Sequence, residues 1–197
     1  MVKDVAAHEF FHIVTPLNIH SEKVSQFNFV KPTPSRHLWL YEGTTEWASD
    51  MMQLRGGIYD FAKYTEEVGK KIMYNEKYYD KNYSLLKLSL TSFNDEGQRQ
   101  YGNIYQRGAL VAGLLDIRLL ELSGGKKGLR EVVLELSKKF GQNKSFNDEK
   151  FFDTFVAMTY PEIKDFFEGY VKNAEELPIK EYYAKLGIDY IAKKRNR

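Results

Sequence analysis

Apolar and polar residues follow a helical spacing along most of this chain. In several long stretches the apolar residues recur every three or four positions, which places them on one face of a helix. The pattern therefore predicts a mainly α protein. The predicted helices span residues 1–14, 38–55, 58–79, 104–123, 128–140, 147–159, 161–173 and the first part of 178–194.

The remaining segments lack a regular period. Residues 15–37 are polar and carry several of the chain's prolines, so they are predicted to be mostly loop. Residues 81–103 are predicted to be extended or looped. The end of 178–194 is compatible with a strand, and the basic residues 192–197 are predicted to be a short solvated tail.

Composition limits the class of protein further. The 197 residues suit one domain, predicted over residues 1–197, and 43% hydrophobic with 28% charged residues is a globular balance. A net charge of +2 does not suggest a nucleic-acid partner, and no apolar run is long enough for a membrane span. Cysteine is absent, which excludes disulfides and thiolate metal sites.

The stretch "AHEFFHIV", residues 7–14, carries the first candidate chemistry. On a helix, His8 and His12 lie one turn apart on the same face, where both imidazoles can bind one cation. Glu9 points to a different side and is suited to reach a water molecule. The H-E-x-x-H spacing is typical of zinc peptidases. The surrounding residues are apolar and predict a buried helix, in which unpartnered imidazoles would be destabilising.

A catalytic zinc also needs a third protein ligand. The metzincin continuation is absent, because no glycine stands three residues after His12 and residue 18 is Asn. Glu42 is the alternative, since it is an acid within the apolar run "LWLY" of a second helix. Glu46 lies one turn further on. It either hydrogen-bonds a ligand histidine or is an exposed helix charge, and the sequence leaves both open.

Three motifs in order resemble a known family. They are "HEFFH", then "LWLYEG" at a long spacing, then "YQRGALVAGLLDIRL". This arrangement resembles the glycyl aminopeptidase family of gluzincin metallopeptidases, and the similarity extends to "ELPIKEYYAKLGIDY". The resemblance implies a helical, thermolysin-like catalytic domain built around a zinc-binding helix. It also implies an aminopeptidase that removes small N-terminal residues such as glycine or alanine from peptides.

The resemblance also implies roles for particular residues. His8, His12 and Glu42 would bind Zn²⁺, and Glu9 would act as the general base. Tyr105 would stabilise the transition state, because a phenol O–H can donate to the carbonyl oxygen as that oxygen becomes negative. Composition alone would not single out Tyr105, since the chain has 14 tyrosines.

Members of this family carry a β-rich region before the zinc helix and commonly a PDZ-type module. The chain is therefore expected to be a catalytic-domain fragment without these parts, and a poor catalyst alone. The parent protein is expected in the periplasm or cell envelope. A function of another class remains open, namely a helical module that binds peptide or carbohydrate without turnover. Bound zinc would separate the two.

Overall fold

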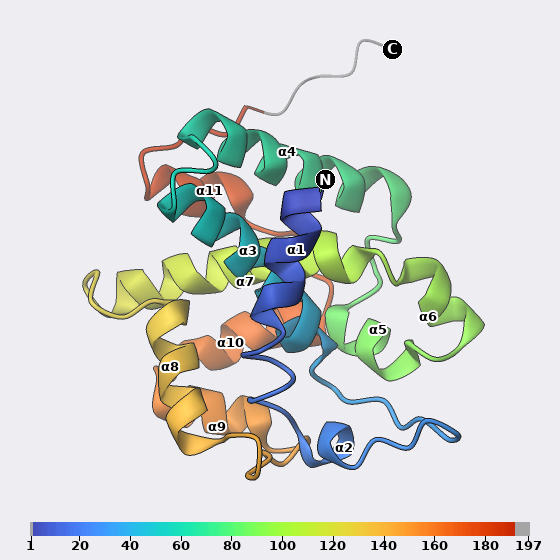
Figure 1. The fold of residues 1–197 in the computed structure, drawn as a ribbon. Helices are drawn as coiled ribbons and strands as arrows, with labels where there is room; N and C mark the ends of the chain where they lie inside the picture. Colours follow the sequence, from blue (N-terminus) through green and yellow to red (C-terminus); the bar gives the residue numbers. More distant parts are fainter. Residues whose placement is uncertain (1, 192–197) are drawn as a thin grey trace.

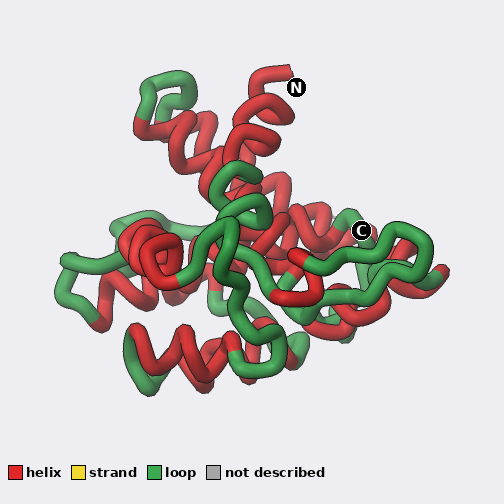
Figure 2. The backbone as a smooth tube through the Cα atoms, turned by 60° about the horizontal axis from the view of Figure 1, so that its bottom comes forward, coloured by secondary structure: helices red, strands yellow, loops and turns green. Residues whose placement is uncertain are grey.

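The computed structural model describes residues 2–191, and these form a mainly helical fold, as the hydrophobic pattern predicts (Figure 1). Over this range no strand is present apart from two isolated bridges, and Figure 2 shows helices joined by loops. The elements are α1 (Val2–Phe11), α2 (Glu22–Ser25), the π-helix η1 (Trp39–Gly43), α3 (Thr44–Arg55), α4 (Phe61–Tyr78), α5 (Leu85–Thr91), α6 (Asp95–Gln100), α7 (Asn103–Leu122), α8 (Leu129–Lys139), α9 (Phe151–Met158), α10 (Ile163–Phe167), the π-helix η2 (Glu168–Lys172) and α11 (Ile179–Ala184).

Helix α7 lies at the centre of the molecule (Figure 1). Helices α3, α4 and α8, together with η1, pack against it, so its side chains are buried on most sides. Leu114 and Leu115 are fully enclosed in the core. This helix ends at Leu122, and Gly124 and Gly125 follow with positive φ angles that glycine adopts without strain.

A close backbone contact fixes η1 against α7. A Cβ atom built on Gly43 would lie 2.7 Å from the Cα of Gly108, and one built on Gly108 would lie 2.9 Å from the Cα of Gly43. Only glycine at both positions allows the two helices to approach so closely. The contact therefore ties the segment that carries Glu42 to the helix that carries Tyr105.

Helix α1 differs from the prediction in its length and burial. It ends at Phe11, where hydrogen bonds such as His12 N–H to the Glu9 carbonyl tighten the backbone ahead of Pro16, which has no N–H to donate. Only one face of α1 packs, mainly against α3, and the helix lies on the outside of the helical body (Figure 2). Phe10 is 64% exposed and Ile13 56%. The prediction of a helix buried on nearly all sides was wrong.

Residues 81–103 also differ from the prediction of extended or looped chain. They contain the two short helices α5 and α6. Each begins at a polar side chain that caps it, because Ser84 accepts from the Lys87 N–H and Asn94 accepts from the Gly97 N–H. The polar residues that obscure the helical period are thus partly the capping residues.

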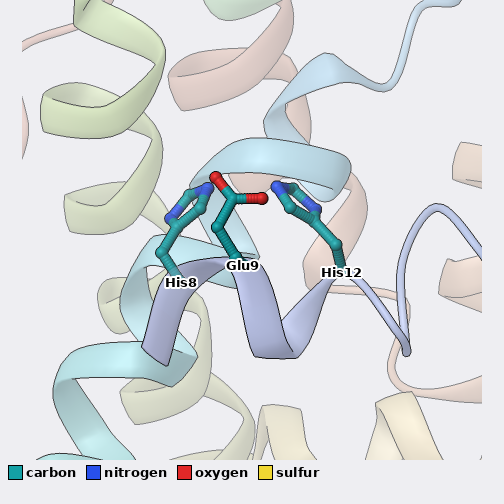
Figure 3. A group of neighbouring side chains, drawn as sticks. All are labelled: His8, Glu9 and His12. Carbon is teal, nitrogen blue, oxygen red and sulfur yellow. The ribbon is translucent and has the colours of Figure 1, made fainter. Parts of the chain in front are cut away.

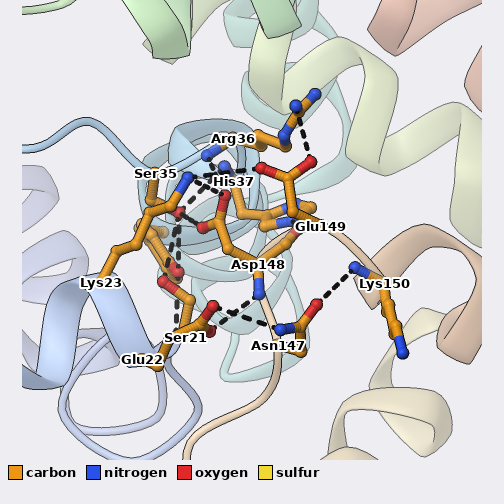
Figure 4. Close-up of polar contacts among 11 residues, drawn as sticks. Ser21, Glu22, Lys23, Ser35, Arg36, His37, Asn147, Asp148, Glu149 and Lys150 are labelled. Atoms are coloured by element: carbon orange, nitrogen blue, oxygen red, sulfur yellow. Dashed lines mark hydrogen bonds and ion pairs between the residues drawn. The ribbon is translucent and has the colours of Figure 1, made fainter.

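Residues 15–37 form loop with one short helix, α2, and a cluster around Asp148 attaches this loop to the chain before α9 (Figure 4). The buried Asp148 carboxylate accepts hydrogen bonds from the Ser35 hydroxyl at 2.5 Å and the Arg36 N–H at 3.1 Å. Lys23 forms an ion pair with the same carboxylate at 3.2 Å. Contacts between residues far apart in sequence therefore order this loop.

The C-terminal segment forms the predicted short helix, α11, and no strand follows it up to residue 191. The basic residues 192–197, predicted to be a tail, lie outside the described residues. Among the helices of residues 2–191, none combines the length and the apolar character that a bilayer crossing requires.

Candidate metal centre

Helix α1 and the turn after it bring His8, Glu9 and His12 together. Each of these residues offers a ligand atom within 4.8 Å of the others. Figure 3 shows the Glu9 carboxylate between the two imidazole rings. His8 is buried, His12 is half-buried and Glu9 is exposed. The group thus lies at the surface of the fold with one buried side.

A hydrogen bond at Nδ1 holds each imidazole ring. The His8 Nδ1 lies 2.8 Å from Oε2 of Glu46, and the His12 Nδ1 lies 3.0 Å from the Thr15 carbonyl oxygen. Both partners accept, so the proton of each neutral ring belongs on Nδ1. In that neutral form the Nε2 lone pair of each ring is available to a cation, whereas a protonated His8 donates from Nε2 to Glu42 instead.

Both Nε2 atoms point to the same oxygen of Glu42. Oε2 of Glu42 lies 3.2 Å from Nε2 of His8 and 3.6 Å from Nε2 of His12. Ligand atoms around a tetrahedral zinc, each about 2.0–2.2 Å from it, are separated by roughly 3.3–3.6 Å. The two nitrogen-to-oxygen distances therefore match the ligand spacing around zinc, and imidazole nitrogen and carboxylate oxygen are donor types that zinc binds.

The position of Glu42 depends on η1. This segment is a π-helix that continues directly into α3, and such turns are frequent at functional sites. Trp39, Leu40 and Tyr41 on the same segment are buried in the core, whereas the Glu42 side chain keeps 18% of its surface exposed toward α1. The core packing of η1 thus anchors a carboxylate that would be destabilising without a partner.

A charged network extends from His8 into the protein. Lys71 on α4 lies 2.7 Å from Oε1 of Glu46 and 3.1 Å from Oδ2 of Asp50. Burial opposes the charge on His8, but the hydrogen bonds to Glu42 and Glu46 outweigh it and raise its pKa to about 9. Burial raises the pKa of Asp50 to about 6, although Lys71 opposes this shift.

Two tyrosines of the α6–α7 region lie beside this group. The Tyr105 ring centroid is 5.5 Å from that of His8, and Tyr101 is 6.1 Å from Tyr105. Burial and, second, the Glu42 charge raise the pKa of both phenols. The hydroxyls are therefore protonated at neutral pH and can donate hydrogen bonds.

The structure brings together all six residues singled out in the sequence: His8, Glu9, His12, Glu42, Glu46 and Tyr105. Glu46 is bonded to His8 and is not an exposed helix charge.

Sequence reasoning missed Thr15, Lys71 and Tyr101. Thr15 accepts through its backbone carbonyl, which every residue type carries, so its identity gives no signal. Lys71 lies on α4, far from the motifs in sequence. Tyr101 lies one helical turn before Tyr105, which is a usable signal.

The fold and this cluster define a helical metallopeptidase-type domain. The family model of M61 glycyl aminopeptidases matches residues 2–111, which is more than half of the chain. The chain belongs to this family.

One solved structure shows how far the fold similarity extends. The crystal structure of an aminopeptidase N family protein from Idiomarina loihiensis has a similar fold, with a TM-score of 0.82 and 24% sequence identity. The similarity covers 94% of this chain and 33% of the other, so this chain spans about a third of that protein's length. No curated protein sequence matches the chain.

Proposed function

We propose that the chain is the helical catalytic domain of a zinc-dependent aminopeptidase that removes small N-terminal residues such as glycine or alanine. One observation carries the proposal. The Nε2 atoms of His8 and His12 meet Oε2 of Glu42 at 3.2 and 3.6 Å, while both Nδ1 atoms are bonded elsewhere. Membership of the M61 family supports a peptide substrate.

In this proposal His8, His12 and Glu42 hold the zinc ion. When bound there, zinc would polarise the peptide carbonyl and make water more acidic. Glu9 is the general base, because its carboxylate is exposed between the two imidazoles and is not needed as a ligand. It accepts the proton of the attacking water and transfers it to the leaving amine.

Tyr105 is assigned to the carbonyl oxygen of the substrate. Its phenol remains protonated, and it lies closer to His8 than Tyr101 does along the row of rings. A hydrogen bond from this hydroxyl strengthens as negative charge develops on the oxygen, which lowers the barrier to attack. No observation tests the preference for small N-terminal residues, which stays a prediction. The same holds for the β-rich and PDZ-type regions and for the envelope location.

Zinc content and hydrolysis test the proposal together. The wild-type protein, Glu9→Gln and His12→Ala are purified under zinc-replete conditions, and bound zinc is measured by mass spectrometry. We expect wild type and Glu9→Gln to hold one zinc per chain and His12→Ala to lose it, because Glu9 is not a ligand. Hydrolysis of glycyl and alanyl substrates by the protein should fall at least 100-fold in Glu9→Gln.

Two outcomes would contradict the proposal. If the wild-type protein held no stoichiometric zinc, the assignment of a metal centre would be wrong, and a binding module without turnover would be favoured. Near-normal hydrolysis by Glu9→Gln would remove the general-base assignment even if zinc were present.

A further inference from the structure

A cavity of about 900 Å³ lies between α4, α7 and residues 174–184. Arg107 and Leu110 of α7 line it. Arg107 stands two positions after Tyr105, and successive helical residues turn by about 100°, so the two side chains leave α7 on nearly opposite sides. The cavity therefore faces away from the metal centre and is separate from it.

Arg107 is unusual because it is buried without an acidic partner. The residue is only 4% exposed, and its Nη2 donates to the Glu175 carbonyl oxygen at 2.7 Å. Its Nε is buried and has no hydrogen-bond partner, and among residues 2–191 no carboxylate forms an ion pair with it. Burial alone lowers its pKa to about 10. A buried guanidinium of this kind is destabilising until an anion pairs with it.

The rest of the lining indicates what kind of anion would fit. Ile72, Leu110 and Ile179 are buried aliphatic residues around the arginine. The exposed charged residues of the lining have both signs, and they are Glu76, Lys81, Glu176, Lys180 and Glu181. A doubly charged phosphate would be repelled by the three glutamates. A monoanion with an apolar body suits both the aliphatic lining and the mixed rim.

We propose that this cavity binds the carboxylate of a small ligand with an apolar side chain, such as a free amino acid or the C-terminal residue of a short peptide, and that Arg107 binds that carboxylate. The planar guanidinium matches a carboxylate in bidentate geometry. The volume lies in the usual range for small-molecule sites, roughly 300–1,000 Å³.

The test uses N-acetyl-leucine, free leucine, N-acetyl-leucinamide and inorganic phosphate as probes, with affinity measured by calorimetry. The acetyl group blocks the amine that an aminopeptidase would recognise. We expect N-acetyl-leucine or leucine to bind. Tighter binding of N-acetyl-leucine would indicate the C-terminal residue of a peptide, and tighter binding of leucine would indicate a free amino acid. We expect the neutral amide to bind at least tenfold more weakly. His12→Ala should bind as wild type does, which separates this site from the metal centre.

Two variants assign the site and one serves as control. Arg107→Met removes the guanidinium, and Ala174→Trp fills the cavity while leaving the arginine in place; Ala174 is a lining residue outside the helices. Each should weaken binding at least tenfold. Arg118→Met is the matched control, because Arg118 is on the same helix, pairs with Glu121 and does not line the cavity.

Three results would overturn the proposal. Equal binding of N-acetyl-leucine and its amide would show that no carboxylate is recognised, and tighter binding of phosphate would change the ligand class. Unchanged binding in Ala174→Trp would place the ligand elsewhere. That last variant decides the matter even if Arg107→Met does not fold.

Discussion

The two imidazoles of the candidate metal centre are held by different acceptors. The Thr15 carbonyl that holds His12 is neutral, whereas the Glu46 carboxylate that holds His8 is charged and is itself paired with Lys71. A carboxylate on Nδ1 makes the opposite nitrogen of the ring a better donor to a metal. His8 should therefore depend on Glu46 for its affinity as well as its orientation.

We expect Glu46→Gln to lower zinc affinity by about 10–100-fold while the fold is retained. The amide oxygen still accepts from Nδ1, but the negative charge that strengthens the ring as a ligand is lost. Affinity is measured by competition with a zinc chelator. Glu66→Gln, on the exposed side of α4 and paired only with lysines, is the control. Equal affinity in the two variants would mean that Glu46 has no role beyond packing.

A site residue can be predicted from the sequence when the pattern that marks it lies within one short stretch of the chain. His8, Glu9 and His12 form a local spacing, and Glu42 stands out as an acid in an apolar run, so the sequence alone indicates them. The role of Lys71 cannot be predicted from the sequence, because its pairing with Glu46 and Asp50 arises only when α4 packs beside α3. Tyr105 required a family resemblance.

At the scale of elements, the approach of η1 to α7 decides where Glu42 lies relative to Tyr105. The Gly43–Gly108 contact leaves no room for a side chain on either helix. The two glycines occur in the "LWLYEG" and "YQRGAL" motifs, directly after Glu42 and three residues after Tyr105. Each motif therefore contains a glycine of the helix-packing contact as well as a residue of the candidate site.

Gly108→Ala should lower the free energy of unfolding by about 1–3 kcal/mol, because the new methyl group meets the Gly43 backbone at 2.9 Å. Gly113→Ala on the same helix is the control, since its methyl group would meet Trp47 at an ordinary 3.5 Å. That change should be neutral or slightly stabilising through helix propensity. Urea unfolding measures both, and a Gly108→Ala protein as stable as Gly113→Ala would contradict the packing argument.

The long helices were predictable because their apolar period is regular, and α4, α7 and α8 lie close to their predicted ranges. The short helices α5 and α6 were not, because each has only six or seven residues, too few to show a helical period, and each depends on its capping residue. The exposure of α1 was also missed. Its sequence is apolar on several sides, yet within residues 2–191 α1 packs mainly against α3, with Glu42 of η1 and Tyr105 of α7 meeting it at His8.

At the scale of the whole molecule, links between distant segments hold the N-terminal loop on the C-terminal helices. His37 is central to one link. Its Nε2–H donates to the Asp148 carbonyl oxygen at 2.7 Å, and its Nδ1 is buried without a partner. The rings of Phe146, Phe151 and Phe152 surround the imidazole. A second proton on this ring would therefore have no acceptor.

This environment makes stability depend on pH in a definite direction. Burial lowers the pKa of His37 from 6.5 to about 4, although the Asp148 carbonyl opposes the shift, and the charged groups nearest to it are Asp148, Arg36 and Lys23. Between these two pKa values the unfolded chain binds a proton at His37 that the folded chain does not. The contribution of neutral His37 to the free energy of unfolding is therefore fully present above pH 6.5, and it is lost as the pH falls toward 4.

We expect the free energy of unfolding to fall by up to about 1.4 kcal/mol per pH unit from this group, and by on the order of 3 kcal/mol in total. His37→Gln removes the titration while keeping an N–H that can reach the Asp148 carbonyl. Urea unfolding of both proteins is compared from pH 8 to pH 4, so that contributions from other groups cancel. The stability difference between them should stay constant from pH 8 to 7, where His37 is neutral in both states, and shrink below pH 6.5. A difference that stays constant down to pH 4 would mean that the folded protein accommodates a charged His37, and that this link does not depend on a neutral ring.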